Sequence, residues 1–592
     1  MEDPKSLVSS EKSTGSSSSV LGTIQGLPYR TNQITDSFNS VLAMIQGHHN
    51  HHHDHHRSNR TNPSSPQFPS KQPKYWPIFG PPDEDLISSL PDSLLQEILC
   101  FLPIEDAIKT SFLSRRWRSL WTQMPTLSFT RECFASKHAK RAAFVNETLA
   151  RFIGPKIKNF LINFKFDEFM DASLDEWVLF ATSHHVEKLS LLLDGGFLYA
   201  PFAECKPYSL PQFLYVNFSL NVLILRQCVV SPTSQVSWPS LKVLSINYSR
   251  LDTEAIEYVL SGTPNLQKLK LHNCGGVNRI SSMSLEALVV DAIYEPHEKN
   301  ELVTQISCPN LQSLSLSGYM YRRTFRLMHA SSLSKANLSF VMTIDKKDKY
   351  DCKKHRSILR DLLEKLCHVE ELTVGTWCLQ AGSLELKVQR DPQKGFEHWG
   401  FTIRSYFVDV LSIWEIKGIS SPLSKRHCLV LETEICEWDI PGIVNLLHSS
   451  PYLKKLVINL NYCDNSKFEF DQTFFDSYEF DGVEFLASAN WIFKCFLQSL
   501  EDIELTGFQS SSWGSEFLVR FMRFLLNNTK VLKKVTIYEQ GGTLLESWQF
   551  SGPNMNPELE SAKRNQILLI LSSGFLLNAN IPDLNSFKDF LL

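Results

Sequence analysis

One stretch near the middle of the 592-residue chain contains a complete structural repeat: residues 239–271 read PSLKVLSINYSRLDTEAIEYVLSGTPNLQKLKL. The pattern Leu-x-x-Leu-x-Leu or a close variant stands near each end, and a proline precedes its first leucine by two positions. The last two leucines of this pattern are separated by one residue, and apolar residues at alternate positions are typical of a strand with one buried face. Between the two patterns, Ala255, Ile256, Val259 and Leu260 recur at helical spacing. The stretch therefore predicts a strand, a helix, a turn and a second strand.

The same pattern returns along most of the chain. The clear copies are Leu220/Leu223/Leu225, Leu241/Leu244/Ile246, Leu266/Leu269/Leu271, Leu285/Leu288/Val290 and Leu311/Leu314/Leu316. The weaker copies are Ile157/Phe160/Ile162, Val186/Leu189/Leu191, Val369/Leu372/Val374, Leu453/Leu456/Ile458, Leu500/Ile503/Leu505 and Leu532/Val535/Ile537. In the central block the copies stand roughly 19 to 26 residues apart, which is the spacing of leucine-rich repeats. Pro309 and Pro451, like Pro239 and Pro264, stand two residues before the first leucine of a repeat.

These regularities predict an α/β fold with an irregular leucine-rich-repeat solenoid, a horseshoe whose parallel strands line a concave face. A single unit offers one short strand and is unstable alone, whereas stacked units share a core. The competing interpretation is a compact α/β domain with a doubly wound sheet. It is disfavoured because the spacing is too short for full crossover helices throughout.

A second informative segment precedes the repeats. Residues 90–103 read LPDSLLQEILCFLP, and residues 111–121 read SFLSRRWRSLW. A wide apolar stripe is expected on one helix, formed by Leu94, Leu95, Ile98, Leu99 and Leu102. Asp92 and Ser93 are expected to cap this helix and Pro103 to end it. Glu105 and Asp106 would open a second short helix, and Ser114 would start a third. About forty residues cannot bury so many large apolar groups by themselves, so a partner is expected to cover the remainder.

This segment closely resembles an F-box. The matching positions, in order, are Leu90, Pro91, Leu94, Ile98, Leu102, Pro103, Ser111, Arg116, Trp117 and Leu120, while Ser114 stands where many F-boxes have Cys. The resemblance implies docking onto the Skp-type adaptor of a cullin ubiquitin ligase. The adaptor-binding residues that it implies are Leu90, Pro91, Leu94, Ile98, Leu102, Pro103, Ser111, Trp117, Leu120 and Trp121. The alternative is an ordinary helical hairpin inside a larger core.

The C-terminal part resembles plant F-box proteins in particular. One element is Trp438–Ile443 with the Leu446–Pro451 segment that follows it. The other runs from Cys495 through Leu500–Leu505 to Leu532–Ile537, and it looks like the FBD domain that closes many plant F-box/leucine-rich-repeat proteins. The same stretch is also readable as two more repeats. The chain thus resembles the plant F-box/FBD/LRR family.

Five segments are predicted. They are a disordered leader rich in Ser, His and Pro (1–79), an F-box (84–124), irregular leucine-rich repeats (125–490), an FBD-like region (491–560) and a C-terminal cap or tail (561–592). The leader has too little apolar surface to offset the entropy of ordering it. Its histidine run at residues 48–56 would chelate metal ions in a test tube, but a functional site needs fixed geometry and supporting contacts. We therefore interpret the run as low-complexity sequence.

Composition favours an intracellular protein. The net charge is −4 and the pI is near 6.5, so the overall balance gives no argument for nucleic acid or an anionic membrane as partner. The 13 cysteines are odd in number and contain no Cys-x-x-Cys pair, which indicates reduced thiols rather than disulfides or a zinc site. The N-terminus lacks the order of a signal peptide, and the apolar stretch 567–577 is too short to span a bilayer. We expect a cytoplasmic and/or nuclear protein with no cofactor and no metal.

No catalytic motif is present: there is no P-loop, G-x-G-x-x-G, G-x-S-x-G or H-E-x-x-H. His184 and His185, beside Glu187, are expected to have a surface or turn role rather than to act as a base or a ligand. The basic cluster at 346–349, with Lys353 and Lys354 close by, is expected to lie in a solvated loop. The alternatives are a weak nuclear-localisation signal or a patch that binds an anionic ligand. Trp377 and Trp438 are expected in the repeat core rather than in a ligand pocket.

Together these observations predict a non-enzymatic substrate-recognition subunit of an SCF-type cullin ubiquitin ligase. Its F-box would hold a Skp-type adaptor and, through it, cullin, while its repeats would hold an unknown protein substrate. Strand residues such as Lys242, Gln267, Lys270 and Gln312 are candidates for reading that partner. The alternative is a repeat scaffold or small-molecule sensor whose F-box does not support ligase activity.

Overall fold

The structure is a computed structural model that places most of the chain from residue 87 to residue 578. It describes residues 87, 89–130, 138–165, 170–194, 207–249, 251, 254–291, 302–321, 323–343, 352–379, 383–390, 399–406, 411–433, 435–460, 468–469, 480–493, 497–509, 516–550 and 557–578. The predicted leader (1–79) and the basic cluster at 346–349 lie outside these residues. Two compact units are present, residues 1–157 and residues 158–592.

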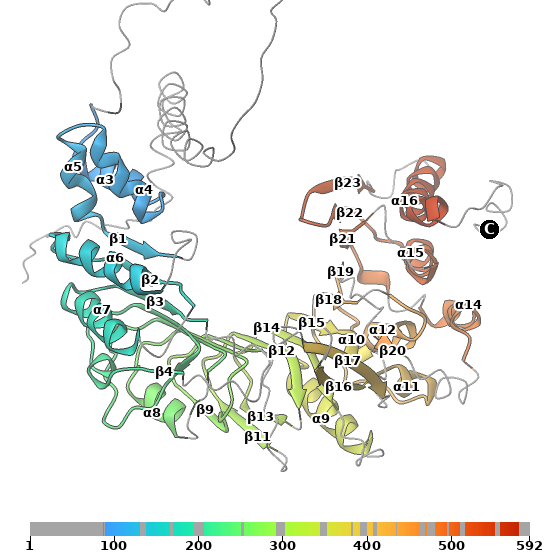
Figure 1. The fold of residues 1–592 in the computed structure, drawn as a ribbon. Coiled ribbons are helices and arrows are strands. Elements are labelled where there is room, and N and C mark those ends of the chain that lie inside the picture. The colour runs from blue at the N-terminus through green and yellow to red at the C-terminus, as the bar shows by residue number, and fades with distance from the viewer. Residues whose placement is uncertain are drawn as a thin grey trace, which may run out of the picture. The chain divides into compact units, whose positions relative to one another are not determined.

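The first unit contains the three helices that the sequence predicts. They are α3 (Asp92–Leu99), α4 (Ile104–Lys109) and α5 (Trp117–Leu120), with single 3-10 turns at Thr110–Phe112 and Trp121–Gln123 (Figure 1). Strand β1 (Thr126–Phe129) and helix α6 (His138–Arg151) follow in the same unit. The predicted boundary after residue 124 therefore does not separate the two units, because the chain stays with the F-box helices as far as residue 157.

The starts of two helices differ from expectation. The residue before α3 is Pro91, and no side chain caps the helix, so Asp92 and Ser93 are its first residues rather than its caps. The carbonyl of Pro91 instead accepts the N–H of Leu94 and of Leu95, at 3.0 and 3.2 Å. Helix α5 begins at Trp117 and not at Ser114. The carboxylate of Asp92 is unavailable for capping because it binds the guanidinium of Arg116.

One long sheet organises the second unit. Its strands are β2 (Asn159–Ile162), β3 (Lys188–Leu192), β5 (Val222–Arg226), β7 (Val243–Asn247), β8 (Lys268–His272), β10 (Ala287–Asp291), β12 (Ser313–Tyr321), β14 (Lys335–Thr343), β15 (Glu371–Gly375), β18 (Cys428–Glu432), β19 (Lys455–Asn459), β21 (Asp502–Phe508), β22 (Lys534–Glu539) and β23 (Leu544–Gln549). They pair in this order, and every pair is parallel except β22 with β23. The order never reverses, so the sheet is not doubly wound, and the predicted solenoid with one strand per repeat is confirmed.

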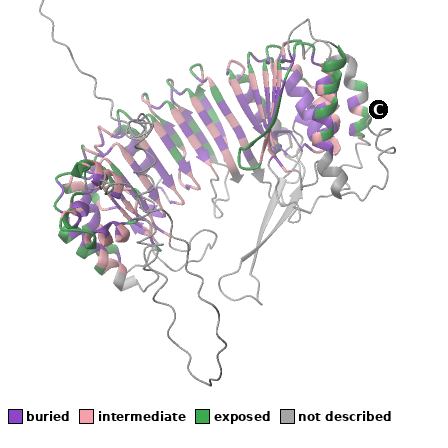
Figure 2. Ribbon diagram, turned by 90° about the horizontal axis from the view of Figure 1, so that it is seen from above, coloured by how far each residue is buried: buried purple, intermediate pink, exposed green. Residues whose placement is uncertain are grey.

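The middle leucines of the repeats stand in register. Leu244 pairs with Leu269, Leu269 with Leu288, and Leu288 with Leu314. All four side chains are at most 1% exposed. Figure 2 shows the resulting alternation of buried and less buried residues along neighbouring strands. These leucines therefore form one continuous core, as the sequence predicts.

Helices return the chain between many of the strands. They are α7 (Asp171–Ser183), α8 (Ala255–Ser261), α9 (Cys352–Lys365), α10 (Thr376–Leu379), α11 (Leu411–Ile416), α12 (Asp439–His448), α14 (Gly482–Phe493), α15 (Glu516–Asn528) and α16 (Pro557–Asn578), with 3-10 turns at Gln212–Tyr215 and Leu497–Ser499. Further strands outside the long sheet are β4 (Tyr208–Ser209), β6 (Cys228–Val229), β16 (Ser383–Arg390), β17 (Trp399–Tyr406) and β20 (Phe468–Glu469). Strands β16 and β17 form an antiparallel hairpin between α10 and α11.

In three repeats the returning segment is a strand instead of a helix. Strands β9 (Arg279–Ser281), β11 (Leu302–Ser307) and β13 (Arg323–His329) form a second parallel sheet. Along β11 the side chains of Thr304 and Ile306 are buried, while Val303 and Gln305 are exposed. This alternation has the period of a strand.

The last helix closes the sheet at its C-terminal end. Helix α16 contacts α15, and the side chain of Arg564 lies over the ring of Phe550 at 5.8 Å. Trp548 of β23 donates a hydrogen bond to Gln566 of α16 at 3.2 Å. The boundaries predicted at 490/491 and 560/561 fall inside α14 and α16. The start of α16 could not be predicted from the sequence, because the first turns of this helix are polar and have only a weak apolar pattern.

Candidate functional site

The residues predicted to bind an adaptor fall into two groups in the first unit. Pro91 and Pro103 are exposed, and the side chains of Leu90, Leu94, Ile98, Leu102 and Ser111 are half-buried. Trp117, Leu120 and Trp121 are buried, with exposed fractions of 7, 2 and 4%. Such side chains offer no surface to a partner, so these three belong to the unit's own core. The Ser111 Oγ is also buried, and it has no hydrogen-bond partner among the described residues.

Three large apolar side chains that the prediction omitted are exposed next to the first group. Phe101 is 77% exposed, Phe112 is 90% exposed and Leu113 is 44% exposed. Phe101 follows the end of α3, and Phe112 ends the 3-10 turn after α4. Their position just beyond a helical run is the sequence signal that would have identified them. They extend the candidate docking face.

A charged contact fixes the start of this face. The Arg116 guanidinium binds the Asp92 carboxylate, with Nε 2.8 Å from Oδ1 and Nη2 2.6 Å from the same oxygen. It also donates to the carbonyl oxygen of Leu90. Arg116 precedes α5, whereas Asp92 and Leu90 lie at the start of α3. One side chain therefore holds the Leu90–Pro91 segment against the third helix.

In the second unit, a polar row crosses five neighbouring strands at one level, at the last residue of β5, β7, β8 and β10 and within β12. Its members stand in register on consecutive strands of the sheet: Arg226, Asn247, His272, Asp291 and Ser317. The residue that follows has a positive φ in several repeats, for example 56° at Gln227, 50° at Tyr248 and 51° at Asn273. Each of these three residues donates its N–H to the next strand's carbonyl, at 2.9, 2.7 and 2.6 Å. The repeated left-handed residue turns the chain away at the same level in each repeat.

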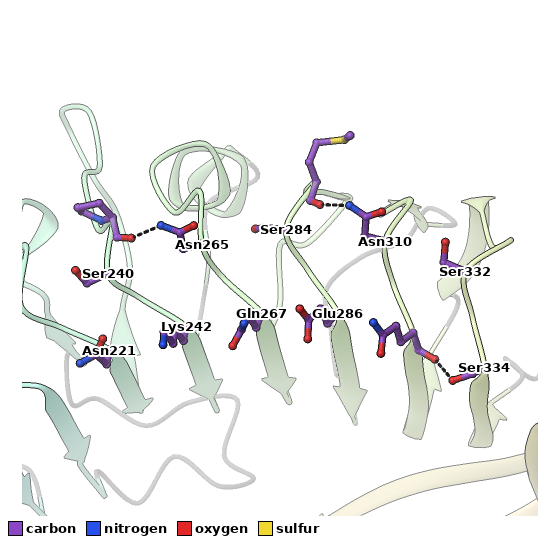
Figure 3. A pocket seen from close by; sticks show the side chains of 13 residues that line it. Asn221, Ser240, Lys242, Asn265, Gln267, Ser284, Glu286, Asn310, Ser332 and Ser334 are labelled. Atoms are coloured by element: carbon purple, nitrogen blue, oxygen red, sulfur yellow. Dashed lines mark hydrogen bonds between the residues drawn. The ribbon is translucent and has the colours of Figure 1, made fainter. Parts of the chain in front are cut away.

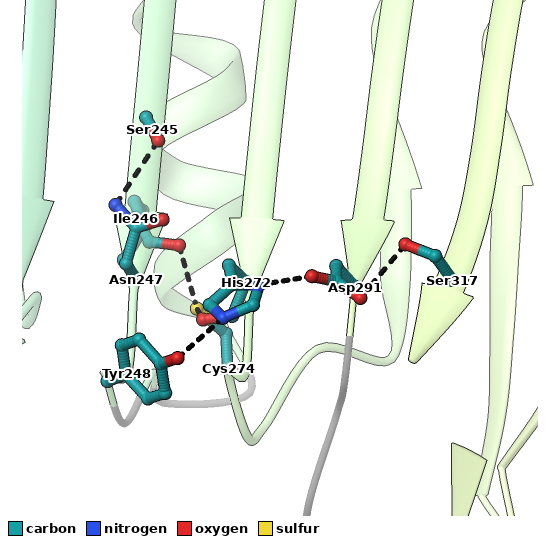
Figure 4. A network of polar contacts seen from close by, with 8 residues as sticks. All are labelled: Ser245, Ile246, Asn247, Tyr248, His272, Cys274, Asp291 and Ser317. Carbon is teal, nitrogen blue, oxygen red and sulfur yellow. Dashed lines mark hydrogen bonds and ion pairs between the residues drawn. The ribbon is translucent and has the colours of Figure 1, made fainter. Parts of the chain in front are cut away.

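His272, Asp291 and Ser317 of this row form a polar network with Tyr248 (Figure 4). His272 contacts Asp291 through Nδ1, and its Nε2 lies 2.8 Å from the hydroxyl of Tyr248. Ser317 donates to the other oxygen of Asp291 at 2.9 Å, and the Arg226 guanidinium lies 5.3 Å from the centre of the Tyr248 ring. Both imidazole nitrogens are thus engaged, and the network ties five strands together at one edge.

The four residues suggested as partner-reading positions lie on two surfaces. Lys242, Gln267 and Gln312 line a groove of about 960 Å³ at the opposite ends of the strands, where each strand begins (Figure 3). Lys270 is exposed in the middle of β8. The groove is the larger feature, because it crosses several repeats.

Candidates for chemistry have structural roles where they are described. Burial raises the pKa of Cys228 and of Cys274 to about 12, so both thiols are protonated and unreactive at neutral pH. His184 ends α7 with Nδ1 2.8 Å from the Phe180 carbonyl oxygen, and His185 lies in the following turn. Trp438 packs on Phe480 with ring centres 4.7 Å apart, whereas the side chain of Trp377 lies outside the described residues.

In the described part of the chain, no group of three or more His, Cys, Asp or Glu side chains is arranged to hold a metal ion. None of the helices there combines the length and the apolar character needed to cross a bilayer.

Models of three known domain families match successive parts of the chain. An F-box domain model matches residues 87–129, the model described as At1g61320/AtMIF1, LRR domain, matches residues 149–387, and an FBD model matches residues 492–537. F-box/LRR-repeat protein At3g03360 of Arabidopsis thaliana is 34% identical over 63% of this chain and 70% of its own length. F-box/LRR-repeat protein At5g02910 of the same plant is 29% identical over 76% of this chain and 88% of its own length. With these matches and this fold, the chain belongs to the plant F-box/FBD/leucine-rich-repeat protein family.

Proposed function

We propose that this protein is the substrate-recognition subunit of an SCF-type cullin ubiquitin ligase. Its F-box binds a Skp-type adaptor, which connects it to cullin, and its repeats bind a protein substrate. The observation that carries the proposal is the apolar face of the first unit. Phe101 and Phe112 are 77 and 90% exposed within a short helical segment that also presents Pro91 and Pro103. Large exposed aromatic side chains grouped in this way are typical of a protein–protein interface.

The proposed role requires no catalytic side chain in this subunit. Holding a substrate and a ubiquitin-charged partner in one assembly converts an encounter in solution into an intramolecular one. The second unit suits this role because its core is continuous from repeat to repeat and its edges are fixed by hydrogen-bond ladders. A rigid scaffold loses little conformational entropy when a substrate binds.

The proposal places the protein in the cytosol and/or the nucleus. The thiols of Cys228, Cys274 and Cys378 are unbridged and fully buried, which supports a reducing compartment.

Co-purification tests the proposal. Tagged full-length protein, isolated from plant cells with the proteasome inhibited, is expected to carry a Skp-type adaptor and cullin, and a substrate should accumulate when the protein is removed. Recovery of the adaptor without cullin would favour a scaffold or sensor that does not support ligase activity. Recovery of neither would overturn the proposal.

A further inference from the structure

The groove at the starting edge of the sheet has a regular polar floor. It crosses the N-terminal ends of β7, β8, β10, β12 and β14, and its volume is about 960 Å³ (Figure 3). In each repeat the floor is formed by the residue directly after the first apolar residue of the repeat. Along the floor these residues are Lys242, Gln267, Glu286, Gln312 and Ser334.

Backbone hydrogen bonds hold this row at a constant spacing. The carbonyl oxygen of Lys242 accepts the N–H groups of Gln267 and Lys268, both at 2.9 Å. The carbonyl oxygen of Gln267 likewise accepts two N–H groups, from Glu286 and Ala287, both at 2.9 Å. Successive floor residues are therefore one strand spacing apart, about 4.8 Å.

The wall of the groove is fixed in a similar way. Asn265 donates its side-chain N–H to the carbonyl oxygen of Pro239 at 2.8 Å, and Asn310 donates to that of Met283 at 2.7 Å. Ser240 donates to the carbonyl oxygen of Phe218 at 2.7 Å. Each bond reaches back to the preceding repeat. The lining is thus preorganised, which reduces the entropy cost of binding.

The floor carries two opposite charges that do not pair with each other. Within the described residues, the side chains of Lys242, Gln267 and Glu286 have no hydrogen bond or ion pair. At the same repeat position, Glu501 and Lys533 lie on adjacent strands and form an ion pair of 2.8 Å. Lys242 and Glu286 are instead separated by Gln267, which keeps the two charges about 10 Å apart, two strand spacings.

We propose that this groove binds the substrate, an inference that rests on the proposed function. The occupant is an extended segment of the partner protein that runs across the strands. It places an acidic side chain at Lys242 and a basic side chain at Glu286. In the extended polyproline II conformation the chain rises about 3.1 Å per residue with three residues per turn, so side chains three positions apart lie on the same face about 9 Å apart. The two charges are therefore three positions apart in the segment. Gln267 lies between them and can both donate to and accept from the segment's backbone.

Selection from a phage-displayed library of random peptides tests this inference on the full chain with its adaptor. The wild-type groove should enrich peptides with an acidic and a basic residue three positions apart, in one fixed order. The charge-swapped variant Lys242→Glu/Glu286→Lys should enrich the opposite order. The single variant Lys242→Glu should weaken a selected peptide by at least about tenfold, because it sets like charges against each other.

The swap Glu501→Lys/Lys533→Glu is the matched control, since it exchanges a pair at the same repeat position outside the groove. It should select the same peptides as the wild type. Enrichment without this charge spacing, identical peptides from wild type and groove swap, or no enrichment would each overturn the inference. Enrichment of sequences from residues 1–79 would overturn it in favour of an intramolecular occupant. Adaptor retention, measured on the same samples, reports separately on the proposed function.

Discussion

Arg116 and Asp92 are 24 positions apart in the sequence, yet their side chains form a paired contact in which Nε and Nη2 both reach one carboxylate oxygen. The same guanidinium donates to the Leu90 carbonyl oxygen. Only arginine offers several donors in a rigid planar arrangement, so lysine cannot reproduce both contacts. The pair therefore sets the position of the Leu90–Pro91 segment at the edge of the candidate docking face.

Replacing Arg116 by Ala should weaken adaptor binding more than it weakens folding. The two side chains are 36 and 61% exposed, so the loss of the ion pair should lower the free energy of unfolding by no more than about 1 kcal/mol. Adaptor affinity, measured by calorimetry, should fall because the Leu90–Pro91 segment loses its anchor. Arg118→Ala is the matched control, since Arg118 is a neighbouring exposed arginine. Equal affinities for the two variants would contradict this role.

Truncating the docking face should remove the adaptor and leave the repeats folded. The double substitution Leu90→Ala/Pro91→Ala and the single substitution Phe112→Ala should each cost roughly 2 kcal/mol or more of binding free energy, as interface anchors do. Leu423→Ala is the control, because Leu423 is 74% exposed in the second unit. Undiminished pull-down of a Skp-type adaptor by the double variant would refute the assignment of this face.

The apolar period of the repeats was enough to predict most strands of the long sheet, but three escaped: β14, β18 and the antiparallel last strand β23. In β14 the pattern is Leu333, Ala336 and Leu338, and in β18 it is Arg426, Leu429 and Leu431. Ala336 and Arg426 are 3 and 1% exposed, so they fill core positions where other repeats have a larger apolar residue. A search for leucine at each position cannot find such repeats. The neighbouring repeats enforce the register there.

The candidate sites were predictable to different degrees. The adaptor face follows from the Leu, Pro and Ile pattern of one short segment, although burial of Trp117 could not be read from that pattern. The groove depends on which residues of separate repeats come to lie side by side. Lys242 and Glu286 are far apart in the sequence, and their spacing exists only once the strand register is known.

Replacing Arg426 by Met should stabilise the protein. This side chain is 1% exposed, its Nε bonds Ser424 Oγ at 2.6 Å, and its Nη1 has no partner among the described residues. Burial lowers the pKa of Arg426 to about 10, so the folded state bears the cost of a buried charge at all lower pH values. That cost is relieved only as the pH rises above about 10, where the folded state releases the proton.

Urea unfolding at neutral pH should show a gain of about 1–4 kcal/mol for Arg426→Met, the range found when buried ionic groups are replaced by apolar ones. Arg326→Met is the control, because Arg326 is exposed on β13, and it should change stability by less than about 0.5 kcal/mol. A clear loss of stability in Arg426→Met would show that the guanidinium holds the repeat together.

Deleting residues 1–79 should leave unfolding and adaptor affinity essentially unchanged. The composition of this leader gives it no core to contribute. Thermal unfolding and calorimetry on the shortened chain, compared with the full chain, test the expectation. A marked fall in either quantity would show that the leader docks onto the rest of the protein.

The strand register makes opposite predictions for two adjacent residues of β8. Leu269 lies between Leu244 and Leu288 and is fully buried, so Leu269→Ala should lower the free energy of unfolding by about 2–5 kcal/mol. The loss should spread to adjacent repeats, because each repeat depends on its neighbours. Lys270 is exposed, and Lys270→Ala should cost less than about 0.5 kcal/mol. Urea unfolding of the two variants decides the matter: equal small losses would mean that the register of the sheet is wrong.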